Sequence, residues 1–383
     1  MRPDLLSFRA AAIAVLVFTA GELNASAEPI LVEGTEDHRI AVEVVASGFE
    51  HPWGMAFLPD GRILVTERAG RLRLVSNGSV SAPLDGLPEI DVVGQGGLLD
   101  VALHPEFSEN SLVYLSHSAP GRGGGGTAIT RARLETDGRN PRLSSSETIF
   151  SMNNKTRGSR HFGSRLAFAD DGTLFFTIGD RGERPRAQDA SDHAGSVLRI
   201  HDDGSIPDDN PDSLGADAAP EIWSIGHRNP QSAAIHPETR KLWVVEHGAR
   251  GGDEINVPEK GKNYGWPVIS YGVHYAGGRI GVGTEAPGME QPVHYWDPSI
   301  APSGMAFYTG SLFPRWQGDL FVGALRDRHL ERLKLDGERV VHSERLLGGL
   351  NARIRDVRNG PDGALYVLTD APDGALLRIA PAE

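Results

Sequence analysis

The chain has 383 residues, of which 39% are hydrophobic and 23% charged, a balance typical of a folded globular protein and not of a disordered one. Its formal net charge is −13, so an acidic surface disfavours nucleic acid and anionic membranes as partners. There is no cysteine, which excludes disulfides, a catalytic thiol and thiolate metal sites. The 47 glycines and 25 prolines favour short strands and turns over long helices.

Residues 1–27 are predicted to be a secretory signal peptide. Arg2 and Arg9 precede an apolar run at 10–20, and an Ala-Ser-Ala stretch at 25–27 offers a cleavage site. An uncleaved anchor is the alternative, but the run is shorter than the ~20 residues that span a bilayer. No later segment is apolar enough to cross a membrane. We therefore expect a periplasmic or secreted protein without stable membrane insertion.

A motif recurs six times along the remaining chain: a short apolar strand, a tight polar turn, and a second strand rich in β-branched and aromatic residues. Pro-Asp-Gly at 59–61 and 361–363 supplies the fixed φ and the glycine that hairpin turns require. The repeats start roughly 45 to 70 residues apart, which is close to a propeller blade plus a variable loop. Their first residues are Gly54, Asp100, Arg165, Ser232, Gly304 and Asp356.

This spacing predicts an all-β fold, a six-bladed β-propeller of four-stranded antiparallel blades around a channel. Six repeats leave little room for a further domain, so residues 28–383 are expected to form a single propeller domain. The strand-like stretch 40–45 is expected to complete the last blade and so to join the two chain ends. A two-sheet β-sandwich is the alternative fold.

The repeat also predicts where chemistry gathers. In an antiparallel hairpin, the start of one strand and the end of its partner lie at the same edge. Residues just before each first strand and just after each second strand should therefore surround one mouth of the channel. They include His51, Arg68, Gln95, Arg160, His161, Asp180, Arg181, His227, Arg228, Asn229, Gly248, Ala249, Arg326, Arg353, Arg355 and Asp370.

A basic mouth on an acidic protein predicts an anionic ligand held by charge-assisted hydrogen bonds, with a candidate base among its contacts. Each residue also has a simpler interpretation. A single arginine can pair with a nearby aspartate, His161 and His227 can be buried structural histidines, and Gln95 can be a turn residue. Several arginines that converge from different repeats favour the ligand site.

Metal-binding signals are weak. No HExxH motif or close histidine pair is present, which disfavours zinc. The acidic, glycine-rich stretch 251–256 suits a hard cation with oxygen ligands, meaning calcium, although it matches no EF-hand loop. No GxSxG elbow or Walker loop appears, so a serine hydrolase is not supported.

Several stretches together are more specific than any single motif. They are GQGGLLDVALHP (94–105), RHFGSRLAF (160–168), TIGDRG (177–182), GHRNPQSAA (226–234), EHGARGGDEIN (246–256), KNYGWP (262–267) and RIRDV (353–357). With them, the chain from about His51 onward resembles the soluble aldose sugar dehydrogenases that depend on pyrroloquinoline quinone (PQQ), which are grouped with the glucose and sorbosone dehydrogenases. No generic propeller needs GHRNPQ, DEIN and NYGWP in that order.

The resemblance implies PQQ and calcium as cofactors and an aldose sugar as substrate, oxidised at the anomeric carbon to a lactone by hydride transfer to PQQ. It implies that His161 is the general base, that Asp180 orients it, and that Arg228 with calcium polarises the quinone carbonyl. An external electron acceptor of unknown identity would complete turnover.

The resemblance also implies the binding residues. Implied contacts to the quinone are Gln95, Arg228, Asn229, Arg326, Arg353 and Arg355. The carbonyls of Gly248 and Ala249 would bind the calcium that touches PQQ, whereas Glu254 and Tyr264 resemble residues at a second, structural calcium.

The sequence departs from the well-known glucose dehydrogenases of this group at several positions. Arg326 stands where they have a lysine, and Arg160 where they have an aspartate. The loop that helps to cover the sugar is shortened, which favours an open, broader site. The aromatic residue that contacts the sugar is left open among Tyr271, Tyr275, Tyr295 and Trp296.

Two other functions remain as alternatives. A non-catalytic ligand- or protein-binding propeller would not need His161 and Asp180 together. A calcium-dependent lactonase or hydrolase would need several carboxylates at the channel metal, whereas arginine dominates this mouth.

Overall fold

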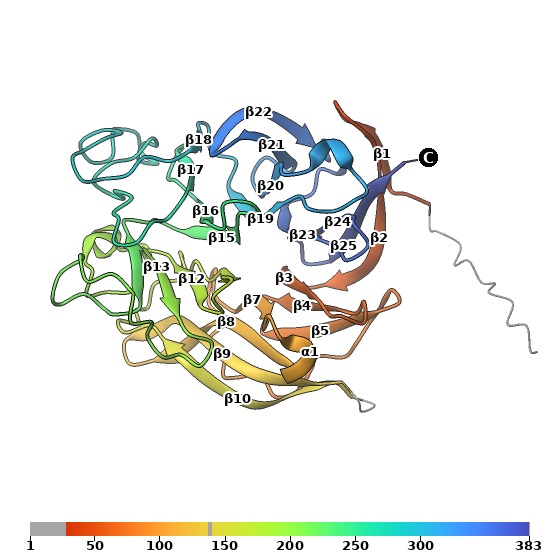
Figure 1. The fold of residues 1–383 in the computed structure, drawn as a ribbon, viewed down its shortest axis with the longest axis horizontal. Coiled ribbons are helices and arrows are strands. Elements are labelled where there is room, and N and C mark those ends of the chain that lie inside the picture. Colours follow the sequence, from red (N-terminus) through yellow and green to blue (C-terminus); the bar gives the residue numbers. More distant parts are fainter. Residues whose placement is uncertain (1–27, 137–139, 383) are drawn as a thin grey trace, which may run out of the picture.

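The six sequence repeats fold into six radial sheets around a central channel (Figure 1). The computed structural model describes residues 28–136 and 140–382. All strand pairings within the sheets are antiparallel, so the protein is the six-bladed β-propeller that the repeat predicts. The predicted signal peptide, 1–27, lies outside the described residues.

Each blade begins with its innermost strand and continues outward. The first three blades are β3 (Pro52–Phe57), β4 (Ile63–Glu67), β5 (Arg71–Ser76) and β6 (Ser79–Val80); β7 (Leu98–Leu103), β8 (Leu112–Gly121), β9 (Gly124–Glu135) and β10 (Arg142–Ser151); and β11 (Leu166–Phe168), β12 (Leu174–Ile178), β13 (Ser196–Ile200) and β14 (Ile222–Ile225). The next two are β15 (Pro230–Ile235), β16 (Leu242–Glu246), β17 (Asp253–Asn256) and β18 (His294–Trp296); and β19 (Pro302–Phe307), β20 (Leu320–Ala324), β21 (Leu330–Asp336) and β22 (Arg339–Leu346).

The last blade joins the two ends of the chain. It combines β23 (Ile354–Asn359), β24 (Leu365–Thr369) and β25 (Gly374–Pro381) with β2 (Arg39–Phe49) and β1 (Leu31–Gly34). β2 pairs with β25, which confirms that the stretch 40–45 completes this blade. The blade has five strands instead of four, because β1 turns back and pairs along the outer edge of β2.

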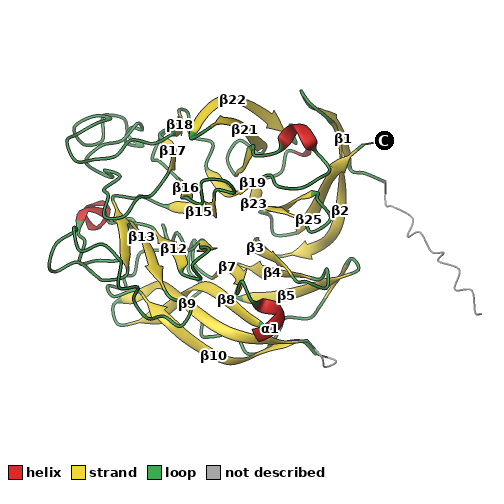
Figure 2. Cartoon of the chain, in the orientation of Figure 1, coloured by secondary structure: helices red, strands yellow, loops and turns green. Residues whose placement is uncertain are grey.

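Helical structure among the described residues is confined to short pieces between strands (Figure 2). They are α1 (Phe107–Asn110) and the 3-10 turns Arg184–Gln188, Pro314–Trp316 and Gly348–Leu350. Within residues 28–136 and 140–382, no helix has the length and apolar character to cross a membrane.

Apolar side chains fill the space between neighbouring blades. One cluster joins Ile129 and Phe150 of the second blade to Phe176 and Leu198 of the third. Burying such side chains stabilises the fold by about 1.5–3 kcal/mol each. The blades therefore form a rigid frame, and the loops at the channel mouths carry the variable chemistry.

The first residues of the six repeats form a ring inside the channel. Arg165 Nη1 lies 3.1 Å from Asp100 Oδ1 and 2.9 Å from Asp356 Oδ1. Arg358 binds the same two carboxylates from β23, at 3.1 Å each. A Cβ at Gly304 would lie 2.3 Å from Asp356 Oδ1, so glycine is required there. These charged side chains fill the channel between its two mouths, and we call them the channel plug.

Candidate active site

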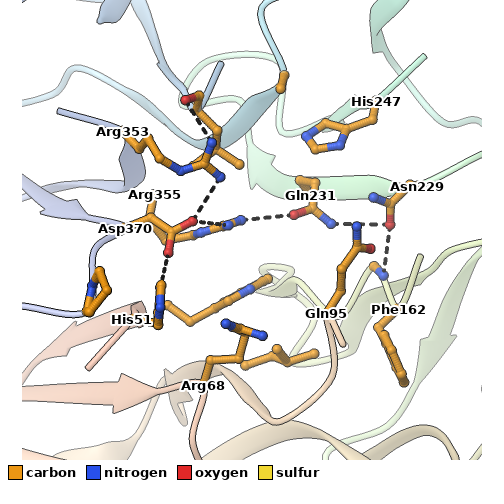
Figure 3. Close-up of a pocket in the computed structure, with 16 residues that line it drawn as sticks. His51, Arg68, Gln95, Phe162, Asn229, Gln231, His247, Arg353, Arg355 and Asp370 are labelled. Carbon is orange, nitrogen blue, oxygen red and sulfur yellow. Dashed lines mark hydrogen bonds and ion pairs between the residues drawn. The ribbon is translucent and has the colours of Figure 1, made fainter. Parts of the chain in front are cut away.

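A two-part cleft occupies the channel mouth at which the innermost strands begin. The inner chamber, about 510 Å³, lies over the channel plug, and the outer chamber, about 900 Å³, adjoins it. The two share Gln95, His247 and Ala301. The inner chamber is lined by His51, Trp53, Arg68, Gln95, Leu99, Phe162, Gly163, Asn229, Gln231, His247, Ala301, Leu325, Arg353, Arg355, Asp370 and Pro372 (Figure 3).

The lining follows from the repeat. Many lining residues directly precede the first residues of the repeats, which form the ring in the channel. One residue before the ring lie Trp53, Leu99, Gln231 and Arg355, and three residues before it lie His51, Phe162, Asn229, Ala301 and Arg353. Pairing of the inner strands is interrupted at these positions by register shifts, which re-aim side chains next to a site. The shifts lie between Pro52 and Met55, Leu98 and Val101, Pro230 and Ser232, Pro302 and Met305, and Ile354 and Asp356.

Asp370 organises the cationic end of the inner chamber (Figure 3). Its Oδ2 accepts hydrogen bonds from Arg353 Nη2 at 3.1 Å and Arg355 Nη2 at 2.8 Å, and its Oδ1 lies 2.8 Å from His51 Nδ1. Burial alone would raise the pKa of Asp370, but Arg355, His51 and Arg353 hold it well below its usual range. The carboxylate is therefore ionised and fixes both guanidinium groups at the chamber wall.

A row of amide groups continues from this cluster toward the outer chamber. Arg355 Nη1 donates to Gln231 Oε1 at 3.2 Å, and Gln231 Nε2 donates to Asn229 Oδ1 at 3.2 Å. The Nε of Arg355 is buried and has no hydrogen-bond partner within the described residues. Sequence reasoning missed Gln231. Its signal is the two-residue spacing from Asn229, because alternate residues of a strand face the same side.

His161 and Asp180 form a buried pair at the join of the chambers. His161 Nδ1 lies 2.6 Å from Asp180 Oδ1, and the imidazole lines the outer chamber. Burial lowers the pKa of His161, even though Asp180 opposes this effect. His161 also has a left-handed backbone, with φ +58°, and its N–H donates to Gln95 Oε1 at 2.8 Å. Such a strained, supported conformation is typical of functional sites.

Trp266 holds the other side of Asp180. Its Nε1–H donates to Asp180 Oδ2 at 2.8 Å, while the Gly182 N–H donates to Oδ1 at 2.7 Å. Burial would raise the pKa of Asp180, but the contacts with His161, Gly182 and Trp266 lower it overall. A charged Asp180 keeps the proton of His161 on Nδ1, so Nε2 can accept a proton. No hydrogen-bond partner for Nε2 is present in the described part of the chain.

Arg228 places a guanidinium group in the outer chamber, which His161 also lines. Only 6% of Arg228 is exposed, Nη1 donates to the His247 carbonyl at 3.1 Å, and Nε is buried without a partner within 28–136 and 140–382. Its guanidinium lies 5.3 Å from the ring of Trp266. Burial lowers the pKa of Arg228, with Tyr275 and Asp180 opposing this effect. An under-bonded buried guanidinium suits an anionic or polarised oxygen.

The structure separates the four candidate aromatic residues. Tyr275 lines the outer chamber with His161 and is 66% exposed. Tyr271 and Tyr295 stack on each other, with ring centroids 4.0 Å apart. Trp296 is buried and packs against His294. Of the four, only Tyr275 lines the chamber.

Gly248 and Ala249 also line the outer chamber. Asp253 fixes their loop, because its Oδ1 accepts the Gly248 N–H at 2.8 Å and its Oδ2 accepts the Ala301 N–H at 2.9 Å. Among the described residues, no three His, Cys, Asp or Glu side chains gather as a metal site. Gly248 and Ala249 themselves can offer a cation only their main-chain carbonyl oxygens.

Glu254 lies beside Glu246 in a small cavity next to the outer chamber. Burial, followed by the neighbouring Glu246, raises the pKa of Glu254 to about 8. Asn256 Nδ2 donates to Glu246 Oε1 at 3.0 Å and to Glu254 Oε2 at 3.3 Å, so the amide holds the two carboxylates side by side. These oxygens suit a hard cation. Tyr264 lines the same cavity, but its hydroxyl already donates to the Val257 carbonyl at 2.6 Å.

Not every cation expected at the mouth faces the cleft. Arg181 is buried, lies 3.4 Å over the ring of Phe162 and donates to the Arg160 carbonyl, so it supports the loop of His161. The Arg160 side chain lines neither chamber, whereas Arg326 lines the outer one. His227 is structural, with Nδ1 2.8 Å from Glu246 Oε1.

A six-bladed propeller with an arginine-lined chamber beside a buried His–Asp pair defines an enzyme-like ligand site, and known proteins share this architecture. A family model described as Glucose / Sorbosone dehydrogenase matches residues 49–378. The aldose sugar dehydrogenase YliI of Escherichia coli is 46% identical over 347 residues, covering 89% of this chain and 93% of that protein.

More distant relatives agree with this match. Quinoprotein glucose dehydrogenase B of Acinetobacter calcoaceticus is 30% identical over 418 residues, covering 86% of this chain and 85% of that protein. The PQQ-bound structure of an aldose sugar dehydrogenase from Streptomyces coelicolor matches with a TM-score of 0.73 and 27% identity, over 89% of this chain and 98% of that one. The chain belongs to the Glucose / Sorbosone dehydrogenase family and is an oxidoreductase of that family.

Proposed function

We propose that this protein oxidises aldose sugars at the anomeric carbon to lactones, with PQQ and calcium as cofactors. One observation carries the proposal: His161, oriented by Asp180 at 2.6 Å, opens onto a chamber that adjoins the arginine-lined one. A binding propeller needs no such pair. The names of the relatives, an aldose sugar dehydrogenase and a quinoprotein glucose dehydrogenase, support the same activity.

The inner chamber fits PQQ, which is planar and carries three carboxylates. A volume of about 510 Å³ is within the range of cofactor sites. Arg68, Arg353 and Arg355 would bind the carboxylates, and Arg355 Nε, which has no partner in the described residues, could donate to one of them. Gln95 and Asn229 offer amides at the same wall, and Arg228 and Arg326 approach from the outer chamber. When bound, PQQ supplies the two-electron acceptor for the hydride of the sugar.

The side chains around the two chambers would each have a separate role in the oxidation. As the C1–H bond of the sugar gives up its hydride, His161 Nε2 takes the proton of the anomeric hydroxyl, and the C1–O bond becomes the lactone carbonyl. Asp180 stabilises the imidazolium that forms. Arg228 places positive charge where negative charge develops on the acceptor. Tyr275 would pack against the sugar from the open side of the chamber.

Two calcium positions belong to the proposal. The carbonyls of Gly248 and Ala249 would hold one ion beside the cofactor, and Glu254 with the Tyr264 carbonyl would hold a structural one. A hard, oxygen-binding cation would also relieve the repulsion between Glu254 and Glu246. Removal of calcium by a chelator should then lower the melting temperature, and re-addition of calcium should restore it.

We also propose that residues 1–27 direct export and that the mature protein is periplasmic or secreted. Amino-terminal sequencing of exported protein should begin at Glu28. An unprocessed chain that stays in the cytoplasm would contradict this.

Dye-linked activity tests the main proposal. Mature protein would be loaded with PQQ and calcium, and reduction of an artificial acceptor would be followed with a panel of aldoses. We expect turnover that requires PQQ. Binding of PQQ without turnover of any aldose would favour a non-catalytic binding propeller. Folded protein that neither binds PQQ nor turns over would contradict the proposal.

A further inference from the structure

The inner chamber contains a second histidine–aspartate pair, apart from His161 and Asp180. His51 Nδ1 lies 2.8 Å from Asp370 Oδ1, and 31% of the His51 side chain is exposed (Figure 3). Like His161, His51 precedes an innermost strand and has a left-handed backbone, with φ +48°. Its main chain is fixed on both sides, because its N–H donates to the Ala371 carbonyl and its own carbonyl accepts the Arg68 N–H. The proposed reaction gives this second pair no role.

Asp370 creates a problem for an anionic ligand. It is an ionised carboxylate, and it already engages the two guanidinium groups, of Arg353 and Arg355, that would bind a ligand carboxylate. A ligand carboxylate at those arginines would lie close to the charge of Asp370, and two like charges that share one site repel each other. The contacts of Asp370 hold its pKa low, so it does not escape the repulsion by taking a proton itself.

His51 can remove this repulsion. A proton on its free nitrogen makes the His51–Asp370 pair an imidazolium–carboxylate pair with no net charge. The charges of Arg353 and Arg355 are then left for the ligand. Resting on the proposed function, which supplies the anionic cofactor, we propose that His51 is a further cofactor-binding residue of the inner chamber and takes up one proton as PQQ binds.

The other charged groups around His51 are paired elsewhere or fixed in charge. Glu50, its chain neighbour, is exposed and pairs with Arg71 at 2.7 Å. Glu67, at the end of β4, is buried and pairs with Arg71 and Arg73. The guanidinium of Arg68 lines the chamber and is permanently charged.

By linkage, a site that binds its ligand with a proton binds more tightly at low pH. PQQ affinity should therefore be highest where the His51–Asp370 pair carries the extra proton, and it should fall as the pH rises and that proton is lost. We therefore expect the PQQ affinity of the unmodified chain to fall severalfold as the pH is raised from mildly acidic to mildly alkaline values.

Calorimetric titration of PQQ into calcium-saturated mature protein tests the proposal. Comparison of the binding heat in buffers of different ionisation enthalpy gives the number of protons taken up. Saturation with calcium keeps proton release at Glu254 out of the measurement. For the unmodified chain we expect net uptake that approaches one proton near neutral pH.

A matched pair of variants assigns the proton. Asn tolerates a left-handed backbone, and its amide can still donate to an aspartate, but it does not titrate. His51→Asn should abolish uptake and make the affinity independent of pH. His161→Asn is the same change at the other left-handed histidine beside an aspartate, and it should leave the uptake intact. Melting temperatures check that both variants are folded.

The outcomes separate this inference from the proposed function. Binding of PQQ without proton uptake, or with equal uptake in His51→Asn, overturns the role of His51 and leaves the dehydrogenase proposal standing. Absence of PQQ binding to folded, calcium-loaded protein at every pH overturns both.

Discussion

The two mouths of the central channel are built from the same six strands, yet their linings carry different side chains. At one mouth, residues that precede the ring of the plug supply histidine, arginine and amide groups. At the other, the residues that follow the ring are mainly apolar and line a separate cavity, with Met55, Phe57, Leu103, Phe168 and Phe307 among them. The channel plug lies between the two mouths. Strand geometry therefore places side chains in rings, and the residues of each ring decide what a mouth can bind.

The placement of residues in rings also explains how an acidic chain can form a basic chamber. A protein of net charge −13 presents a basic chamber, because the arginines of this chamber come from positions that the repeat brings together. Among the residues that line this chamber, Asp370 alone is acidic. A local field of this kind can attract an anionic ligand even when the whole protein is acidic.

The largest expected effect comes from removing the proposed general base, His161, from the polar mouth. His161→Gln should lower kcat by about 10²–10⁴, the usual contribution of a general base. Because the inner chamber keeps its arginines, PQQ should still bind. Thr309→Ala, at the apolar mouth, is the matched control and should keep full activity. Dye-linked kinetics measure both variants, and a loss of less than threefold in His161→Gln would assign the base elsewhere.

The channel plug offers the next largest effect, on stability. Arg165→Met leaves Asp100 and Asp356 buried with one compensating arginine in place of two, and the side chain of Arg165 is only 1% exposed. Breaking a buried ion pair from one side costs about 3–5 kcal/mol. Thermal or denaturant unfolding measures the loss. Arg358→Met is the comparison, and it should cost less because 26% of that side chain reaches solvent.

The smallest expected effect concerns Trp266, which donates a hydrogen bond to Asp180 and lines neither chamber. Trp266→Phe removes the hydrogen bond to Asp180 Oδ2, which at 2.8 Å to a charged group is worth about 1.5 kcal/mol, or roughly tenfold in kcat. The pH dependence of kcat/KM for Trp266→Phe distinguishes a lost positioning of Asp180 from a general disturbance of the fold.

The sign of the pH shift follows from the contacts of Asp180. Burial lowers the pKa of His161, so the acidic limb of kcat/KM should lie below the usual ~6.5 in the unmodified enzyme. Loss of the Trp266 donor makes Asp180 more basic, strengthens its attraction for an imidazolium and moves that limb to higher pH. A variant with lower kcat and an unmoved limb would contradict the positioning role.

Sequence periodicity was enough to predict the fold of this protein. Hairpin turns such as Pro-Asp-Gly and the apolar strands around them recur at the spacing of propeller blades. Six such repeats close into a ring when the stretch 40–45 completes the last blade, as its pairing with β25 shows. The same periodicity predicted which backbone positions surround one mouth. His51, His161, Asn229 and Arg355 all lie at the cleft, because strand ends leave little freedom in where the main chain goes.

Only the tertiary structure decided where the side chains at those positions point and with what they pair. Arg355 faces the chamber whereas Arg181 turns beneath Phe162, although both lie at repeat edges. The pairing of His51 with Asp370 joins residues 319 positions apart, and the contact of Trp266 with Asp180 comes from a long, aperiodic loop. Such contacts depend on loop conformation and on charges brought together by the closed ring, and no local pattern in the sequence encodes them.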